Sequence, residues 1–263
     1  MRGVGLAVRQ VRYTNKAFWR NPASAFFTFV FPLMFLVIFT ALLGNDDTQL
    51  PAKDPGTFIT TKLSTYYVAS MATFGVIGAC YTNIAISVSF QRDGGILKRT
   101  RGTPLPGWVY LTGRVIHAVI VAILLVLITM VFGALFYGAR VPEGISWLNF
   151  LATLIVGGAS FAALGLALTA AIPNADASPP IVNATILPLL FLSGIFIPLG
   201  KDPATWIDAI GILFPVRHFA EAMRAGYLGA GIAFDWTDVL VIAAWGVVGL
   251  LLASRFFSWE PRK

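Results

Sequence analysis

Long apolar stretches separated by short polar segments run along most of this chain of 263 residues. Five intervals of 24 to 32 residues contain no Asp, Glu, Lys or Arg: 21–45, 63–91, 115–139, 144–175 and 177–200. A helix needs about 20 apolar residues to cross the hydrocarbon core of a bilayer. Each interval therefore predicts one membrane-spanning helix.

A sixth apolar run begins at Val239 and is interrupted only by Arg255, whose long side chain can reach the membrane interface. The pattern predicts an all-α, polytopic membrane protein with one transmembrane domain over 1–263. Its six transmembrane helices are expected at about 24–43, 65–90, 115–137, 150–172, 181–197 and 239–257.

Two further segments predict helices that do not span. Residues 4–20 mix apolar and basic side chains, which is typical of an interfacial helix on an anionic leaflet. Between spans five and six, the Pro- and Gly-rich stretch LSGIFIPLG precedes an amphipathic stretch over 216–227. This combination predicts short extracellular re-entrant helices.

Composition supports a membrane protein, because 57% of the residues are hydrophobic, 12% are charged and the mean hydropathy is +0.78. Soluble domains have about 25% charged residues. The net charge of +7 has a topological explanation that needs no nucleic acid: with six spans, one side carries 13 basic and 3 acidic residues, and the other carries 6 and 9. The basic side is expected to be cytoplasmic, with both termini on it.

Catalytic signatures are missing from the sequence. No predicted span has Asp, Glu, Lys or Arg in its middle, and neither a GxxxxGK[ST] loop nor a G-x-S-x-G turn occurs. His117 and His218 have no Cys, Asp or Glu at ligand spacing, and Cys80 is expected to be a small buried hydrophobe. We therefore expect no catalytic residue, metal or cofactor on this chain, and a transport role rather than an enzyme. No cleavable signal peptide is expected either.

The loop over 91–114 is compact and basic. Its composition is that of an ordinary cytoplasmic loop. The order of its residues adds a second feature, since Gly94-Gly95 precedes the segment 96–101 and Pro104 and Pro106 follow it. These helix breakers predict one to two helical turns at 96–101.

Three stretches closely resemble the permease subunits of type-2 ABC exporters (ABC-2 permeases), especially the bacterial drug-exporter-like branch. They are QRDGGILKRTRGTPLP at 91–106, PLLFLSGIFIP at 188–198, and FP at 214–215 followed by EAMR at 221–224. The family's six-span layout covers nearly the whole chain. Gln91 and Thr100 depart from the first pattern, in which an acidic residue and Leu are usual.

The resemblance implies a coupling helix in the 91–105 segment that docks into a separate ABC ATPase (nucleotide-binding) subunit, which would carry the ATP and Mg. The residues it assigns to coupling are Arg92, Asp93, Gly95, Leu97, Lys98, Arg99, Thr103 and Pro104. The turn over 173–179, with Asn174 and Asp176, would make a second cytoplasmic contact. The resemblance also implies a second permease, as homodimer or heterodimer, in the bacterial cytoplasmic membrane and its lipids.

Polar residues on spans two and five are candidates for the translocation path, with helix packing as the alternative on span two. They are Thr73, Asn83, Ser87, Asn183, Thr185 and Ser193. A helical spacing also permits ion pairs of Glu221 with Arg217 and with Arg224. These three residues form either an outer gate or a solvated surface cluster of little energetic consequence.

Together, the sequence predicts the membrane subunit of an ATP-driven exporter for an amphipathic or lipid-like substrate, with outward direction resting on the resemblance. The alternatives are a permease that flips lipid-linked polysaccharide or teichoic acid, and a non-transporting membrane anchor or channel subunit.

Overall fold

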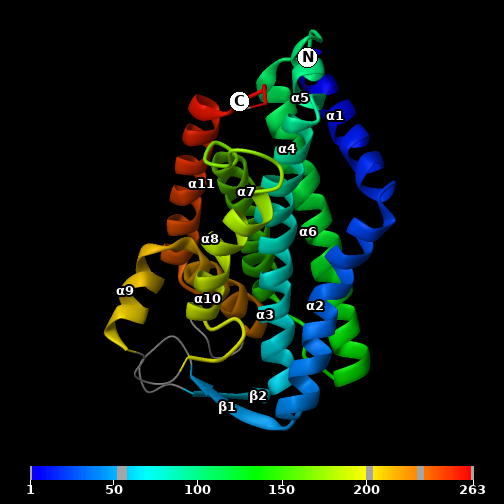
Figure 1. Ribbon diagram of the computed structural model, residues 1–263. Helices are drawn as coiled ribbons and strands as arrows, with labels where there is room; N and C mark the ends of the chain where they lie inside the picture. The colour runs from blue at the N-terminus through cyan, green and yellow to red at the C-terminus, as the bar shows by residue number, and fades with distance from the viewer. Residues whose placement is uncertain (1, 52–57, 200–203, 230–233, 262–263) are drawn as a thin grey trace.

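The computed structural model describes residues 2–51, 58–199, 204–229 and 234–261, and long helices dominate it (Figure 1). The elements in chain order are α1 (Arg2–Trp19), α2 (Pro22–Leu43), β1 (Asp47–Pro51), β2 (Phe58–Lys62), α3 (Leu63–Ile77), η1 (Gly78–Thr82), α4 (Asn83–Asp93), α5 (Ile96–Arg101), α6 (Gly107–Tyr137), α7 (Ile145–Leu168), α8 (Ser178–Leu192), α9 (Thr205–Leu213), α10 (Pro215–Leu228) and α11 (Trp236–Phe256).

Five described helices are long and apolar enough to cross a membrane, in agreement with a multi-pass membrane protein. They are α2, the continuous helix α3–η1–α4, α6, α7 and α11. The predicted fifth span corresponds to α8, which has 15 residues and ends at Leu192 instead of Ile197. At about 1.5 Å per residue, α8 is roughly 22 Å long against a core of about 30 Å. A count of six spans therefore stays a prediction.

The helix α3–η1–α4 is the most enclosed of the five. Its middle, Gly78–Thr82, forms a π-helical turn, in which the N–H of Asn83 bonds to the carbonyl of Gly78. Helix α7 approaches the backbone closely here, because a Cβ at Gly165 would lie 2.6 Å from the Tyr81 carbonyl oxygen. The small residues of α7 therefore permit close helix contact.

The segment after α8 forms two helices. The second of them, α10, packs against α3, α7 and α11 and buries Phe219, whose ring fills the space beside Gly157. The predicted helices between spans five and six are therefore present, and their re-entry into a membrane stays a prediction.

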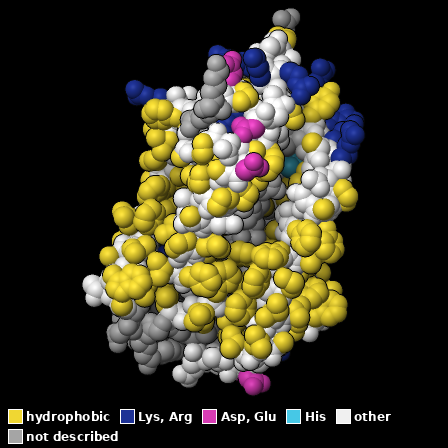
Figure 2. Space-filling view, viewed as in Figure 1, with side chains coloured by type: hydrophobic (Ala, Val, Ile, Leu, Met, Phe, Trp, Pro, Cys, Tyr) yellow, Lys and Arg dark blue, Asp and Glu magenta, His cyan; other side chains and the backbone are white. Residues whose placement is uncertain are grey.

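A short antiparallel hairpin, which the apolar pattern does not predict, joins α2 to α3. It pairs Asp47 with Lys62 and Pro51 with Phe58. The hairpin lies at one end of the molecule, and the opposite end holds α5 and both chain termini (Figure 1). Figure 2 shows Lys and Arg side chains gathered around this second end, which we call the basic end.

Candidate functional site

Helix α5 lies at the basic end, directly after α4. Gly95 adopts the left-handed conformation with φ of +71°, which lets the chain turn between the two helices. Gly102 follows the last helical residue, and Pro104 and Pro106 prevent continuation toward α6. The predicted helix at 96–101 has the bounds that these helix breakers impose.

The two faces of α5 differ. The Leu97 side chain is fully buried in the hydrophobic core. The basic side chains Lys98, Arg99 and Arg101 are exposed. Leu97 therefore fixes α5 to the bundle, and its outer face presents positive charge. Thr103 and Pro104, two other residues assigned to coupling, are also exposed.

Arg92, at the end of α4, points into the bundle and is only 1% exposed. Its guanidinium donates to the carbonyl oxygens of Thr169 at 3.0 Å, Ile172 at 2.9 Å and Pro173 at 3.2 Å. These carbonyls follow the end of α7, where unpaired carbonyl groups carry partial negative charge. The Arg92 side chain therefore joins α4 to the α7–α8 turn and does not face solvent.

Asp93 completes this junction. Its Oδ1 accepts from Arg92 Nε at 3.2 Å, and its Oδ2 accepts from the Ala175 N–H at 2.5 Å. The predicted second contact lies in the same turn, where Asn174 and Asp176 are exposed. The structure thus brings the two segments assigned to coupling together through Arg92 and Asp93.

The six residues proposed for the path do not lie in one cavity. The buried hydroxyls of Thr73 and Ser193 donate to carbonyls of their own segments, Ala69 and Leu190, each at 2.8 Å. Asn183 is exposed on α8. On the same helix, the Thr185 hydroxyl lies 2.8 Å from the Tyr81 hydroxyl of η1.

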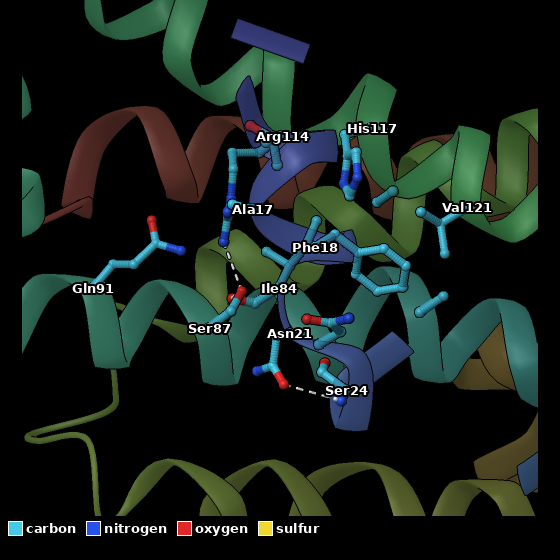
Figure 3. A pocket seen from close by; sticks show the side chains of 14 residues that line it. Ala17, Phe18, Asn21, Ser24, Ile84, Ser87, Gln91, Arg114, His117 and Val121 are labelled. Atoms are coloured by element: carbon cyan, nitrogen blue, oxygen red, sulfur yellow. Dashed lines mark hydrogen bonds between the residues drawn. The ribbon is translucent and has the colours of Figure 1, made fainter. Parts of the chain in front are cut away.

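Asn83 and Ser87 instead line a cavity of about 180 Å³ between α1, α2, α4 and α6 (Figure 3). The other lining residues include Arg114 and His117, which the sequence prediction did not assign to a site. The predicted third span began at 115 and left Arg114 in a loop, whereas α6 begins at Gly107 and carries Arg114 inside the helix.

The proposed gate residues separate into two groups. Arg217 bonds to Glu221 at 2.8 Å and to Asp208 of α9 at 2.6 Å. Arg224 does not form the pair with Glu221 that the spacing permits. Its Nη1 donates to the Gly194 carbonyl at 3.0 Å and approaches the Tyr66 hydroxyl at 3.3 Å, so it joins α10 to the end of α8 and to α3.

His218 has an acidic neighbour that the sequence spacing conceals. Its Nδ1 lies 2.7 Å from Asp238, and its Nε2 lies 3.0 Å from the Ile212 carbonyl oxygen. The hydrogen bond to Asp238 raises the pKa of His218 above its ordinary 6.5, against the opposing effect of burial. Within the described residues, no group of three His, Cys, Asp or Glu side chains could hold a metal ion.

Comparison with known proteins gives a family match over most of the chain. Residues 9–228, which include every residue assigned above to coupling, path or gate, match the family model described as "ABC-2 type transporter".

Curated relatives agree with this match. The chain is 24% identical over 235 residues to "Putative transport permease YvfS" of Bacillus subtilis (strain 168), covering 89% of this chain and 90% of the relative. It is 24% identical over 242 residues to "Inner membrane transport permease YadH" of Escherichia coli (strain K12), covering 89% and 86%. It is also 26% identical over 181 residues to "Probable multidrug ABC transporter permease YbhR" of the same strain, covering 67% of this chain and 47% of the relative.

Proposed function

Because this chain belongs to the ABC-2 type transporter family, we propose that it is the membrane permease subunit of an ATP-driven exporter, coupled through the 91–105 segment to a separate ATPase subunit. The expected cargo is an amphipathic or lipid-like molecule moved outward across the bacterial cytoplasmic membrane. The multidrug name of one relative supports this cargo class.

The attachment of α5 is the observation that carries this proposal. A partner that moves the exposed face of α5 also moves α4, because Leu97 is buried and only Gly94 and Gly95 separate the two helices. The α7–α8 turn would follow, since Arg92 and Asp93 bind its backbone. One contact with α5 can thus displace both α4 and the turn between α7 and α8.

The chemistry of α5 defines the groove that we expect on the ATPase. Lys98, Arg99 and Arg101 favour an acidic groove, since complementary charge steers association. Thr100 stands where the family has Leu, and its hydroxyl donates to the Ile96 carbonyl at 2.9 Å. Ile96 is 47% exposed and offers the apolar contact that Thr100 does not.

Aromatic side chains support an apolar cargo path along α2, α3 and the end of α8. Phe35 packs against Phe74 and Phe196, and Phe191 packs against Phe196. Phe191 is also exposed on α8, the helix that carries Asn183 and Thr185. We propose that a second permease, identical or homologous, packs against this face and encloses the path. Such a lining fits acyl chains or aromatic drugs better than ions.

Coupling can be tested on the exposed face of α5 without disturbing the bundle. The double substitution Lys98→Glu and Arg99→Glu reverses the charge that would contact the ATPase. We expect the variant to fold, to lose copurification of the host ATPase, and to lose ATP-dependent transport of a fluorescent phospholipid or dye in proteoliposomes. Arg12→Glu, which reverses one exposed charge on α1, is the control for charge reversal outside α5.

Two outcomes would contradict the proposal. Full ATP-dependent transport by the double variant would show that the exposed face of α5 does not couple the permease to the ATPase. Ion conductance by the permease alone, without ATP, would favour the channel interpretation. Transport of lipid-linked glycan in place of both probes would keep the coupling scheme and assign the flippase cargo.

A further inference from the structure

A buried cation without an acidic partner faces the cavity between α1, α2, α4 and α6. Arg114 is 8% exposed, and its Nη2 donates to the Ser87 hydroxyl at 2.6 Å (Figure 3). Its Nε is buried without a hydrogen-bond partner. The ring of Tyr110 lies 6.0 Å from the guanidinium carbon. These neighbours are neutral, and no ion pair joins Arg114 to any described residue.

A second unpartnered group lies one helical turn further along α6. His117 is 8% exposed, and its Nε2 is buried without a partner. The remaining polar lining comes from α1, α2, α4 and the α1–α2 junction, and it contains no carboxylate: Thr14, Asn21, Ser24, Asn83, Ser87 and Gln91. An uncompensated cation and a set of neutral polar groups therefore surround the same space.

An unpaired charge in such a place is costly. Removing a guanidinium from water without a counter-charge loses several kcal/mol, and ionisable groups inside membrane helices usually mark functional sites. The missing partner should be an anion that accepts hydrogen bonds from several sides. A phosphate group has this property, and the Arg fork matches its oxygens.

We propose that this cavity binds one phosphate group, and that the headgroup of a membrane phospholipid supplies it. In this arrangement Arg114 and His117 contact the phosphate oxygens, and Ser87 orients the guanidinium. The proposal needs only that the chain spans a membrane, so it does not rest on ATPase coupling.

The surroundings favour a lipid over a free ion. The cavity lies toward the basic end, next to α1, whose exposed Arg9, Arg12 and Lys16 suit an anionic leaflet. Exposed apolar side chains continue away from it along α6, at Ile116, Ile120 and Leu124, and along α2, at Phe27. A headgroup in the cavity would leave its acyl chains against these surfaces. The lipid would then tie α1 to the helix pair α4 and α6.

Native mass spectrometry of the full-length protein in mild detergent can test this. The probes are phosphatidylglycerol, diacylglycerol with the same acyl chains, and inorganic phosphate. We expect one phosphatidylglycerol to remain bound per chain and no diacylglycerol. Arg114→Gln should weaken retention by roughly ten- to hundredfold, the range for losing a charged hydrogen-bonding partner. Arg101→Gln, which removes an exposed charge on α5 away from the cavity, should retain the lipid fully.

A second variant guards against misfolding of Arg114→Gln. Ala17→Trp adds a ring at an exposed position that lines the cavity and leaves Arg114 unchanged. It should also lose the lipid. Displacement of the lipid by inorganic phosphate at millimolar concentration would support the phosphate site and assign it a soluble anion. Equal retention by the wild type, Arg114→Gln and Ala17→Trp, or equal binding of diacylglycerol, would overturn the proposal.

Discussion

Two buried arginines at the basic end have opposite surroundings. Arg92 joins α4 to the α7–α8 turn and donates to three carbonyl oxygens and one carboxylate. Arg114, on α6, has one hydroxyl partner and a buried Nε with none. The chain itself supplies the hydrogen-bond acceptors of Arg92. For Arg114, the proposed acceptor is a phosphate group from outside the chain. Burial alone therefore does not separate a structural arginine from a binding one, whereas the set of partners does.

The largest expected effect comes from Arg92→Leu. The substitution leaves the carbonyls of Thr169, Ile172 and Pro173 and the Oδ1 of Asp93 without this donor, so we expect a loss of about 3–5 kcal/mol in the free energy of unfolding. Thermal unfolding in detergent measures the loss. Arg101→Leu, at an exposed position of α5, should change little. An unchanged midpoint for Arg92→Leu would show that the junction does not hold the two segments together.

A smaller effect on stability is expected where His218 on α10 meets Asp238 on α11. The folded state raises the pKa of His218, so its protonation stabilises the fold. This contribution is complete below the ordinary value of 6.5 and disappears as pH rises through the raised value. Unfolding midpoints measured across this window should fall with rising pH.

The control for this pH effect is His218→Gln, which keeps a polar side chain and removes the titration. The variant should lose the part of the pH dependence that belongs to this window. If the wild type and the variant fall in parallel, the His218–Asp238 contact contributes nothing to the pH dependence of stability.

The smallest effect is expected from Arg114→Leu in lipid-free detergent. Replacing an unpaired buried cation by an apolar side chain costs little, so the free energy of unfolding should stay within about 1 kcal/mol of the wild type or rise. Added phosphatidylglycerol should stabilise the wild type and not the variant. A loss as large as that of Arg92→Leu would make the two arginines equivalent and remove the contrast between them.

Much of the helix pattern follows from the sequence, because long uncharged intervals in lipid permit little besides helices. The bounds of α5 were also predictable, since Gly94-Gly95 and the two prolines act locally. The hairpin was not, because its ten residues carry too little apolar alternation to indicate strands.

The candidate sites were harder to predict than the helices. Three of the four partners of Arg92 lie 77 to 81 residues away in sequence, and these three are backbone carbonyls, which no side-chain motif reveals. Arg114 lies one residue outside the uncharged interval 115–139, so the pattern predicts it in a loop, whereas α6 begins at Gly107. His218 and Asp238 are 20 residues apart and meet only because α10 packs against α11.

The π-helical turn at Gly78–Thr82 has a geometric consequence for the basic end. It holds one residue more than an α-helical turn, so every side chain after it is rotated by about 100° around the helix axis. Ser87 and Arg92 point toward their partners with this extra residue in place. Deleting one residue from η1 would restore a uniform α-helix. It would turn Ser87 away from Arg114 and Arg92 away from the α7–α8 turn, although none of these residues would be changed.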